Sequence, residues 1–503
     1  MFAIMHHNPP AIVNYQQQNT SQVSLKGNFA LLKTNEILLN FEEISKIDRE
    51  SGNCQEISEY LKVRFQKAGF TVKQNPDGTI CAYRGLNKAR NNAIILQSHM
   101  DMVAESADGN PKKPIKMHLK DGWLYANDRT LGADDGIGVS AMLAVAEDAR
   151  FKNYPLEMIV TTDEETTMKG ANALSKKDFY GKYLINIDSE SLGVITKGCA
   201  GILEFEVNEK IKMLPLKSDD FAKITVNITG GKGGHSASVS ESYFNPLKVL
   251  IVLTKDKDFK LISITGGEKF NIVPMQAKCE ILVPKPKSQE IKISLEKYLK
   301  GIRGKNLIEN PNLNYSILLE NTPTGIEYVE PGIKNKLLAS LDEIPIGLLS
   351  KFEDNVSIKT SQNLGALRIA NGEVHAKIMG RSLDSKEGDE LRNKTAKLLS
   401  EAFDKQISTS CTIPIWEAKE GSLLEDTATK AYPKVSNGQK TSTIIETGGL
   451  ETAIFTQKKP NLQQISIGPT IEDPHSVQER VKVDTIGPFY NWLSKILEML
   501  PKD

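Results

Sequence analysis

The chain has 503 residues, and its 63 Lys and Arg balance its 63 Asp and Glu, so the formal net charge is zero. Hydrophobic residues make up 39% and charged residues 25%, which is typical of globular proteins and excludes collagen-like, coiled-coil and largely disordered chains. The balanced charge also argues against a nucleic-acid-binding protein, which usually carries a basic face. At about 150 residues per domain, this length allows two to four domains.

Sequence features also bear on location. No run approaches the roughly 18 apolar residues of a membrane span, and residues 1–22 lack the basic and apolar regions of a secretory signal. The cysteines, which form no Cys-x-x-Cys pair, are Cys54, Cys81, Cys199, Cys279 and Cys411. Such scattered cysteines are typical of a reducing compartment, so we expect a cytoplasmic protein without membrane partners. Residues 1–26 are polar and rich in Asn and Gln, and we expect a flexible arm there.

After the arm, helical and strand patterns alternate. Apolar residues recur at helical spacing over 54–65, and Gly69 ends this helix. Further helices are predicted at 137–149 and at 489–500. Short apolar runs without alternation, which indicate buried strands, occupy 93–96, 156–160, 183–187 and 465–467. This order predicts an α/β domain with a mainly parallel sheet and flanking helices.

The middle of the chain has a different pattern. From residue 221, apolar residues alternate as in a half-buried strand, and helical segments then alternate with paired strand candidates. The helices are predicted at 246–253, 290–302, 334–341 and 387–403, and the strands at 277–283 and 313–319. We therefore expect a two-layer α+β domain at 206–410, inserted into the α/β domain that occupies 27–205 and 411–503.

Acidic residues and histidines follow the predicted parallel strands or precede the helix at 137–149. They are His99, Asp101, Asp134, Glu164, Glu165, Asp188 and His475. In open α/β sheets, ligands bind beyond the carboxyl ends of the strands, so we expect these side chains to converge on one crevice. Each of these features alone commonly has a structural role. For example, an Asp-Asp pair before a helix is an ordinary N-terminal cap. Their joint occurrence at strand ends favours a functional site.

The residue types fit a pair of zinc ions. Zinc binds imidazole nitrogen and carboxylate oxygen, and two ions about 3.5–4 Å apart need a bridging carboxylate to offset their repulsion. The candidate ligands are His99, Asp134, Glu165, Asp188 and His475. Asp134 is the natural bridge, and Asp101 is placed to accept the second imidazole N–H of His99. Manganese or cobalt would also accept these ligands.

Six segments carry these residues in a distinctive combination. They read LQSHMDMV (96–103), TLGADDGIG (130–138), TTDEETTMKGA (161–171), INIDSE (185–190), GGHS (233–236) and SIGPTIEDPHS (466–476). Together they resemble the aminoacyl-histidine dipeptidases, the Xaa-His or carnosinase-like members of the co-catalytic di-zinc exopeptidase family. The resemblance covers essentially the whole chain after residue 30. It implies a zinc-binding domain interrupted by a lid domain, two Zn²⁺ per subunit and a homodimer.

The same resemblance assigns the metal ligands to two groups. By match to the family pattern, His99, Asp134 and Asp188 would hold one zinc ion. Asp134, Glu165 and His475 would hold the other. Asp134 is therefore the shared ligand in the family pattern, as the chemistry of the residues also suggests.

The resemblance also implies catalytic and substrate-binding residues. Glu164 would be the general base, and Asp101 would orient a ligand histidine. In the lid, His235 matches the family histidine that contacts the tetrahedral intermediate. Asn271 and Arg381 match family residues that contact the substrate. Arg381 would bind the C-terminal carboxylate of the substrate through a bidentate pair of hydrogen bonds.

Two segments depart from the family pattern. The family's His-Ala-Gly-Leu-Glu segment reads Thr-Gly-Gly-Leu-Glu at 447–451, and only Trp416 remains of its Tyr-Pro-Gly-Trp segment. Both lie on the expected substrate side, so the zinc chemistry is kept while the preference for His at P1′ stays open.

These features predict a di-zinc metallopeptidase that hydrolyses dipeptides, with Xaa-His as the expected substrate. A metal-bridged hydroxide would attack, and Glu164 would move the proton. Another di-zinc aminopeptidase or an N-acyl amino-acid hydrolase would use the same residues. A non-enzymatic peptide-binding relative is disfavoured, because all the ligands and the base are present.

Overall fold

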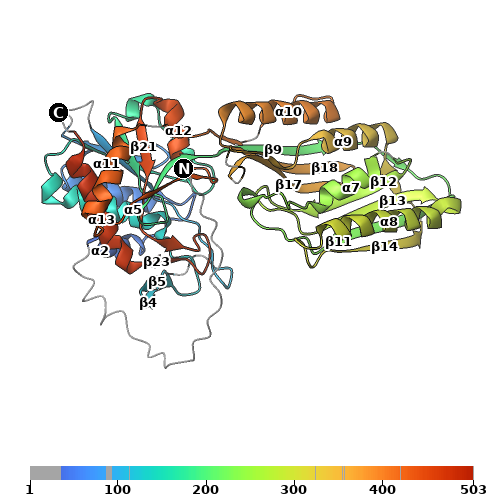
Figure 1. The fold of residues 1–503 in the computed structure, drawn as a ribbon, viewed down its shortest axis with the longest axis horizontal. Coiled ribbons are helices and arrows are strands. Elements are labelled where there is room, and N and C mark those ends of the chain that lie inside the picture. The colour runs from blue at the N-terminus through green and yellow to red at the C-terminus, as the bar shows by residue number, and fades with distance from the viewer. Residues whose placement is uncertain are drawn as a thin grey trace, which may run out of the picture. The chain divides into compact units, whose positions relative to one another are not determined.

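The computed structural model describes residues 36–85, 93–110, 112, 114–255, 257–322, 325–353, 355, 357–409, 411–419 and 421–501. The arm predicted at 1–26 lies outside these residues. The chain divides into two compact units (Figure 1). Unit 1 holds the described residues up to Cys199, then Ala418–Glu446, and the described residues from Leu450 onward. Unit 2 holds Ala200–Glu417 and Thr447–Gly449. It therefore includes the whole range 206–410 that the sequence predicts for the inserted domain.

Unit 1 is built on an eight-stranded sheet in the order β1-β2-β6-β3-β7-β21-β8-β20. The strands are β1 (Thr71–Gln74), β2 (Ile80–Arg84), β3 (Ile94–His99), β6 (Leu156–Thr161), β7 (Tyr183–Asn186), β8 (Val194–Cys199), β20 (Ser442–Glu446) and β21 (Gln463–Ser466). The central strands β6, β3, β7 and β21 run parallel, while β2 is antiparallel to both of its neighbours. The four apolar runs of the sequence become these central strands. The predicted α/β class with a mainly parallel sheet is confirmed.

Helices cover both faces of this sheet (Figure 1). They are α2 (Glu36–Ile44), α3 (Gln55–Lys67), α5 (Ala133–Glu147), α6 (Lys169–Ala173), α11 (Leu423–Ala431), α12 (Glu451–Lys458) and α13 (Val483–Met499), with short 3-10 helices η2 (Ala149–Phe151), η3 (Lys176–Asp178) and η6 (Tyr432–Lys434). Ile94 and Leu96 of β3 share an apolar core with α5 and α13, whereas Gln97, the next residue after Leu96, donates to Glu451 of α12. Alternate residues of one strand therefore face different helices.

A smaller four-stranded antiparallel sheet completes unit 1, in the order β22-β23-β5-β4. Its strands are β4 (Met117–Lys120), β5 (Trp123–Ala126), β22 (Ile471–Glu472) and β23 (Arg480–Lys482). The loop between β22 and β23 carries His475, whose φ of 59° lies in the left-handed region. Arg480 stacks over Trp123 and pairs with Glu472. These contacts hold the two ends of the loop.

Unit 2 is an antiparallel sheet of nine strands with helices on one face (Figure 1). The strand order is β14-β11-β13-β12-β17-β18-β9-β19, β16 pairs with β17, and β10 and β15 form a separate pair. The strands are β9 (Gly201–Lys210), β10 (Met213–Pro215), β11 (Phe221–Thr229), β12 (Lys260–Gly267), β13 (Ala277–Pro284), β14 (Asn314–Asn321), β15 (Glu327–Val329), β16 (Gly347–Lys351), β17 (Ile358–Ala370), β18 (Glu373–Ser382) and β19 (Cys411–Ile413). The helices are α7 (Pro246–Lys255), α8 (Ser288–Asn306), α9 (Pro331–Glu343) and α10 (Ser385–Phe403), with η4 (Ser236–Ser238) and η5 (Lys285–Lys287).

The two faces of the unit 2 sheet differ in polarity. Ile224, Val226 and Ile228 of β11 join the apolar core beneath the helices. Lys223, which alternates with them, pairs with Glu320 at 3.0 Å. The half-buried strand that the sequence predicts from residue 221 has this period-two pattern.

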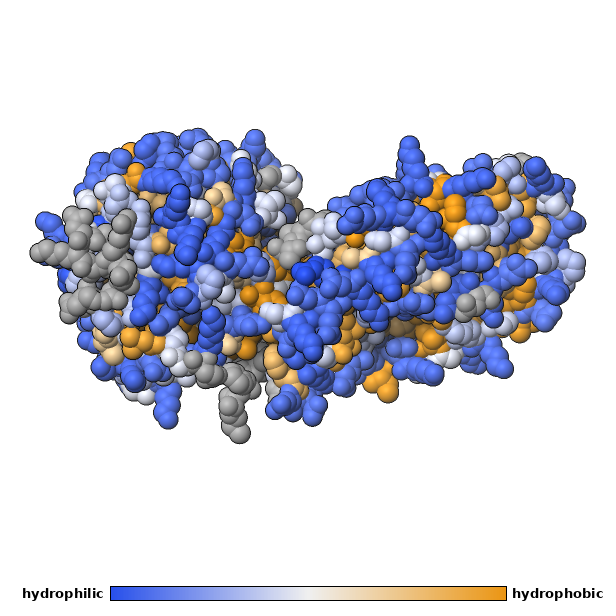
Figure 2. Space-filling view, turned by 90° about the horizontal axis from the view of Figure 1, so that it is seen from above, coloured by the Kyte–Doolittle hydropathy of each residue, from blue (hydrophilic) through white to orange (hydrophobic). Residues whose placement is uncertain are grey.

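Hydrophilic side chains cover most of the face in Figure 2, and hydrophobic ones form small separate groups. This surface agrees with the charged fraction of 25%. Within the ranges given above, no helix combines the length and the apolar character that crossing a membrane requires.

Candidate metal centre

Five segments of unit 1 bring the predicted metal ligands and Glu164 to one place. His99 ends β3, Glu164 and Glu165 follow β6, and Asp188 follows β7. Because β3, β6 and β7 are parallel neighbours, their carboxyl ends meet at one edge of the sheet. Asp134 comes from the first turn of α5. His475 comes from the loop between β22 and β23.

Asp134 lies between two histidines. Its Oδ1 is 3.1 Å from His99 Nε2, and its Oδ2 is 3.0 Å from His475 Nε2. Asp188 Oδ1 is 3.4 Å from His99 Nε2, and Glu165 Oε2 is 2.9 Å from His475 Nε2. One oxygen of Asp134 therefore faces His99, which lies beside Asp188. The other oxygen faces His475, which lies beside Glu165.

These distances define two groups that could each hold a metal ion, His99–Asp134–Asp188 and Asp134–Glu165–His475. The ligand atoms of each group lie within 4.8 Å of one another, and a third overlapping group is His99–Glu164–Glu165. Within the described residues, every group of this kind belongs to this one cluster. The structure thus brings together all five predicted ligands and Glu164.

Burial makes three carboxylates of the cluster, Asp188, Glu164 and Glu165, hard to ionise. It raises the pKa of Asp188 to about 7 and that of Glu164 well above its ordinary value. Burial, together with the charge of Asp134, also raises the pKa of Glu165. A divalent cation would offset this repulsion between buried like charges. Glu165 Oε1 is buried without a hydrogen-bond partner, as expected of a carboxylate oxygen whose partner is a cation.

The histidines act in the opposite direction on Asp134. Burial alone would raise its pKa, but hydrogen bonds with His475 and His99 outweigh burial and lower it. Burial would lower the pKa of His475, yet Asp134 and Glu165 outweigh it and raise the value to about 11. The carboxylates of the cluster therefore stabilise positive charge next to His99 and His475. Such a site is suited to a pair of metal ions.

Asp101 holds the first histidine and the two glutamates. It is fully buried, and its Oδ1 is 3.5 Å from His99 Nδ1. Its carboxylate accepts the N–H of Glu164 at 3.1 Å, the N–H of Glu165 at 3.3 Å and the hydroxyl of Ser51 at 2.8 Å. The structure therefore places Asp101 beside His99, where the sequence predicts it.

Three further carboxylates near the cluster are not among the predicted site residues: Glu190, which is exposed, and the buried Glu451 and Glu479. Desolvation raises the pKa of Glu190 and of Glu451 to about 8, and Glu451 accepts from Gln97 at 2.5 Å and from Thr161 at 2.6 Å. Glu190 and Glu479 lie two and four residues beyond a predicted ligand. That closeness along the chain is the signal that could have identified them, whereas for Glu451 the signal is its place at the end of the segment 447–451, which matches the Glu of the family pattern.

The three predicted lid residues all lie in unit 2. His235 Nδ1 accepts the N–H of Ala237 at 3.3 Å, and Asn271 Nδ2 is 3.5 Å from His235 Nε2. Burial, and next the charge of Arg381, lowers the pKa of His235. Arg381 is 7% exposed, donates to the carbonyl of Thr447 at 3.0 Å and keeps a buried Nε without a partner. Burial lowers the pKa of Arg381 to about 10. A bound anion would stabilise the charged form of this buried guanidinium.

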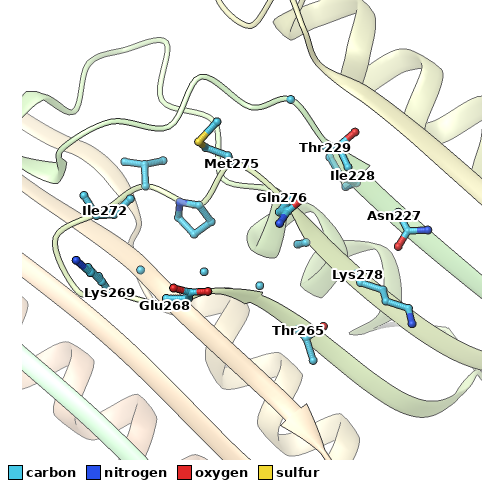
Figure 3. A pocket seen from close by; sticks show the side chains of 17 residues that line it. Asn227, Ile228, Thr229, Thr265, Glu268, Lys269, Ile272, Met275, Gln276 and Lys278 are labelled. Carbon is cyan, nitrogen blue, oxygen red and sulfur yellow. The ribbon is translucent and has the colours of Figure 1, made fainter. Parts of the chain in front are cut away.

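Unit 2 also contains a cavity of about 830 Å³ against β11, β12 and β13 (Figure 3). Its wall includes Ile228, Thr265, Met275 and Lys278. Among the described residues that line it, Glu268 is the one carboxylate, and there is no histidine or cysteine. The groups suited to metal chemistry therefore lie in unit 1 and not in this cavity.

Known proteins resemble the chain along nearly its whole length. It is 27% identical over 474 residues to the cytosol non-specific dipeptidase of Escherichia coli (strain K12), covering 92% of this chain and 96% of that relative. The solved structure of aminoacylhistidine dipeptidase from Vibrio alginolyticus shares the fold, with a TM-score of 0.79 at 24% identity and coverage of 93% and 97%. Aminopeptidase PepT from Bacillus cereus has a TM-score of 0.57 at 17% identity and coverage of 92% and 97%. Residues 95–499 match the model of peptidase family M20/M25/M40, and the chain therefore belongs to this family.

Proposed function

We propose that the chain is a cytosolic metal-dependent dipeptidase that uses two zinc ions. The observation that carries the proposal is Asp134, whose two carboxylate oxygens face His99 and His475 at 3.1 and 3.0 Å. A shared carboxylate of this kind is what two closely spaced cations need. Bound there, the two ions would polarise the scissile carbonyl and lower the pKa of the attacking water.

The side chains of unit 1 have distinct roles in this proposal. Glu164 takes the proton of the attacking water and delivers it to the leaving amine. The position of Glu164 supports this role, because its carboxylate lies beside the two metal groups, close to His99 and Glu165. Asp101 keeps the ring of His99 oriented and holds the backbone of Glu164.

Unit 2 supplies groups for substrate recognition. His235 stabilises the developing oxyanion, and Asn271 lies within reach of its ring. Arg381 binds the C-terminal carboxylate of the dipeptide, which is supported by its buried Nε without a partner. These roles apply to dipeptides in general, and Xaa-His is the first substrate to examine because of the resemblance noted above.

A substrate panel tests the proposal. Purified protein is assayed with Xaa-His dipeptides, other dipeptides, tripeptides and N-acyl amino acids, and its metal content is measured. We expect hydrolysis of dipeptides that a chelator abolishes and added zinc restores. Preference for tripeptides or for acyl amino acids would favour another aminopeptidase or an acyl amino-acid hydrolase instead. Absence of bound metal and of chelator-sensitive hydrolysis would favour a peptide-binding protein.

A further inference from the structure

The turn that carries Asp134 is not helical, although α5 begins at Ala133. Gly132 has a φ of 69°, Asp134 has φ −80° and ψ 114°, and Asp135 has φ −105° and ψ 34°. N–H groups at the start of a helix have no helical carbonyl to donate to, so they need another acceptor. Asp134 can stay between two histidines only if this turn is held.

Glu479 supplies the missing acceptors. Its Oε2 accepts the N–H of Gly132 at 2.8 Å, and its Oε1 accepts those of Ala133 at 2.7 Å and Asp134 at 3.2 Å. Glu479 is 2% exposed and lies four residues after His475. One buried side chain therefore ties the loop of His475 to the turn of Asp134.

Arg49 holds the same turn from its carbonyl side. Its Nη2 donates to the carbonyl of Gly132 at 2.5 Å, and its Nη1 donates to those of Met100 at 3.1 Å and Asp101 at 3.2 Å. A Cβ added at Gly132 or at Gly136 would come within 2.5 Å of this Nη2. The glycines of the turn thus leave room for a guanidinium that also holds the segment after His99.

His475 needs such a support more than the other histidine does. His99 belongs to a buried strand, whereas the side chain of His475 is 50% exposed and its φ is 59°. Neither burial nor regular structure keeps its Nε2 at 3.0 Å from Asp134 Oδ2. The hydrogen bonds of Glu479 connect the two segments independently of this contact.

We propose that Glu479 is a positioning residue of the metal centre. It fixes the distance between Asp134 and His475, and thereby the affinity of the group Asp134–Glu165–His475 for its ion. The inference rests on the proposed function, because it needs a metal in that group. The other group depends on it less, since His99 and Asp188 are held by β3 and β7 and only Asp134 is shared.

Metal titration of the full-length protein tests this role. The metal-stripped enzyme is titrated with Co²⁺, whose visible absorption reports the geometry at each ion, and with Zn²⁺ by calorimetry. In Glu479→Gln, an NH₂ group replaces one of the two carboxylate oxygens that accept backbone N–H groups of the turn. At least one of these N–H groups therefore loses its acceptor. We expect the first ion to bind as in the wild type and the second to bind about 10–100-fold more weakly.

A matched control is Glu157→Gln. Glu157 is a buried carboxylate of the same unit that accepts the N–H groups of Tyr180 and Gly181, each at 3.0 Å, from the far end of β6. This variant is expected to bind both ions like the wild type. A loss of affinity in both variants would point to a general effect of removing a buried charge and would overturn the assignment to Glu479.

The remaining outcomes separate the two proposals. A wild-type protein that binds no ion would overturn the proposed function as well. A wild type that binds two ions, beside a Glu479→Gln variant that binds them equally well, would overturn only the positioning role. If Glu479→Gln does not fold, as judged by circular dichroism, Glu479→Asp and Arg49→Lys take its place. Both should weaken the second ion, and wild-type affinities in either folded variant would refute the inference.

Discussion

Glu164 and Glu165 are neighbours in the chain, but their side chains have different partners. Glu165 Oε2 is 2.9 Å from His475 Nε2, and Glu165 belongs to a group with Asp134 and His475. Glu164 groups only with His99 and Glu165. At the scale of the residue, Glu165 therefore belongs to two of the candidate metal groups among the described residues, and Glu164 belongs to one.

Substitution of each glutamate should separate the two roles. Glu164→Gln is expected to lower kcat by about 10²–10⁴-fold, because an amide cannot accept the proton of water. Its metal content should match that of the wild type, whereas Glu165→Gln should lose metal. Steady-state kinetics and elemental analysis measure both effects. Near-normal turnover in Glu164→Gln would remove this residue from the mechanism.

Arg381 leads to a prediction about substrates. Arg381→Lys should raise KM by about 10–100-fold for dipeptides with a free C-terminal carboxylate, since a charge-assisted hydrogen bond contributes about 1.5–3 kcal/mol. For the matching dipeptide amides, KM should change little. Arg368→Lys, on the neighbouring strand β17 and exposed, is the control. Equal effects on acids and amides would contradict a role in carboxylate binding.

The candidate ligands His99, Asp134, Glu165 and Asp188 could be predicted from the sequence, because each one lies at the end of a recognisable strand or the start of a recognisable helix. His475 lies in a loop, and the segment SIGPTIEDPHS (466–476) identified it by resemblance. Parallel strands end at one edge, so residues that are distant in the chain meet there. Glu479 lies four residues after His475, but the sequence does not predict what it binds, and it gives no signal for Arg49. Both residues bind backbone groups of segments far along the chain, and a backbone N–H leaves no mark in the sequence.

At the scale of the element, the start of α5 depends on a glycine in close contact. A Cβ at Gly136 would come 2.5 Å from Arg49 Nη2 and 2.7 Å from Phe41. Gly136→Ala should therefore destabilise the protein by about 1–3 kcal/mol through overpacking. Gly301, within α8, has nothing within 4 Å of its added Cβ, so Gly301→Ala should stabilise by about 0.5–1 kcal/mol. Urea unfolding measures both, and equal effects would contradict the close packing.

Strand β6 begins with a group that makes stability depend on pH. Burial raises the pKa of Glu157 from 4.5 to about 7, so the folded protein keeps a proton that the unfolded chain releases. This contribution to stability is complete below pH 4.5 and is lost as the pH rises through 7. At about 1.4 kcal/mol per pKa unit, the loss amounts to about 3 kcal/mol. Glu157→Gln should lack it, as measured by urea unfolding between pH 4.5 and 8. A constant difference between variant and wild type would contradict the shift.

The elements of the two units were unequally predictable. Strands buried on both faces have unbroken apolar runs, so β3, β6, β7 and β21 could be located from sequence. Strands β9, β12, β17 and β18 lack such a run, because one face of the unit 2 sheet is polar and their apolar residues are interrupted by polar ones. For β17 and β18 a signal existed, since Asn371 and Gly372, with φ of 55° and 78°, form the two-residue turn between Ala370 and Glu373.

At the scale of the whole molecule, metal binding should contribute to stability. The buried carboxylates of the cluster repel one another without a cation, and an ion that binds only the folded state stabilises it by about 2.7 kcal/mol at 100 times its Kd. Zinc should therefore raise the melting temperature of the metal-free protein, and a chelator should reverse the change. His475→Ala should retain about half of the increase. An unchanged melting temperature with and without zinc would contradict a metal centre.

Because unit 2 is inserted into unit 1, the candidate ligands are synthesised at different times. His99, Asp134 and Asp188 are encoded before the insertion, whereas His475 and the strand β21, which lies between β7 and β8, come after it. A ribosome therefore releases the candidate group His99–Asp134–Asp188 long before it reaches His475. Until the last segment emerges, the nascent chain lacks the strand between β7 and β8 and has four of the five candidate ligands.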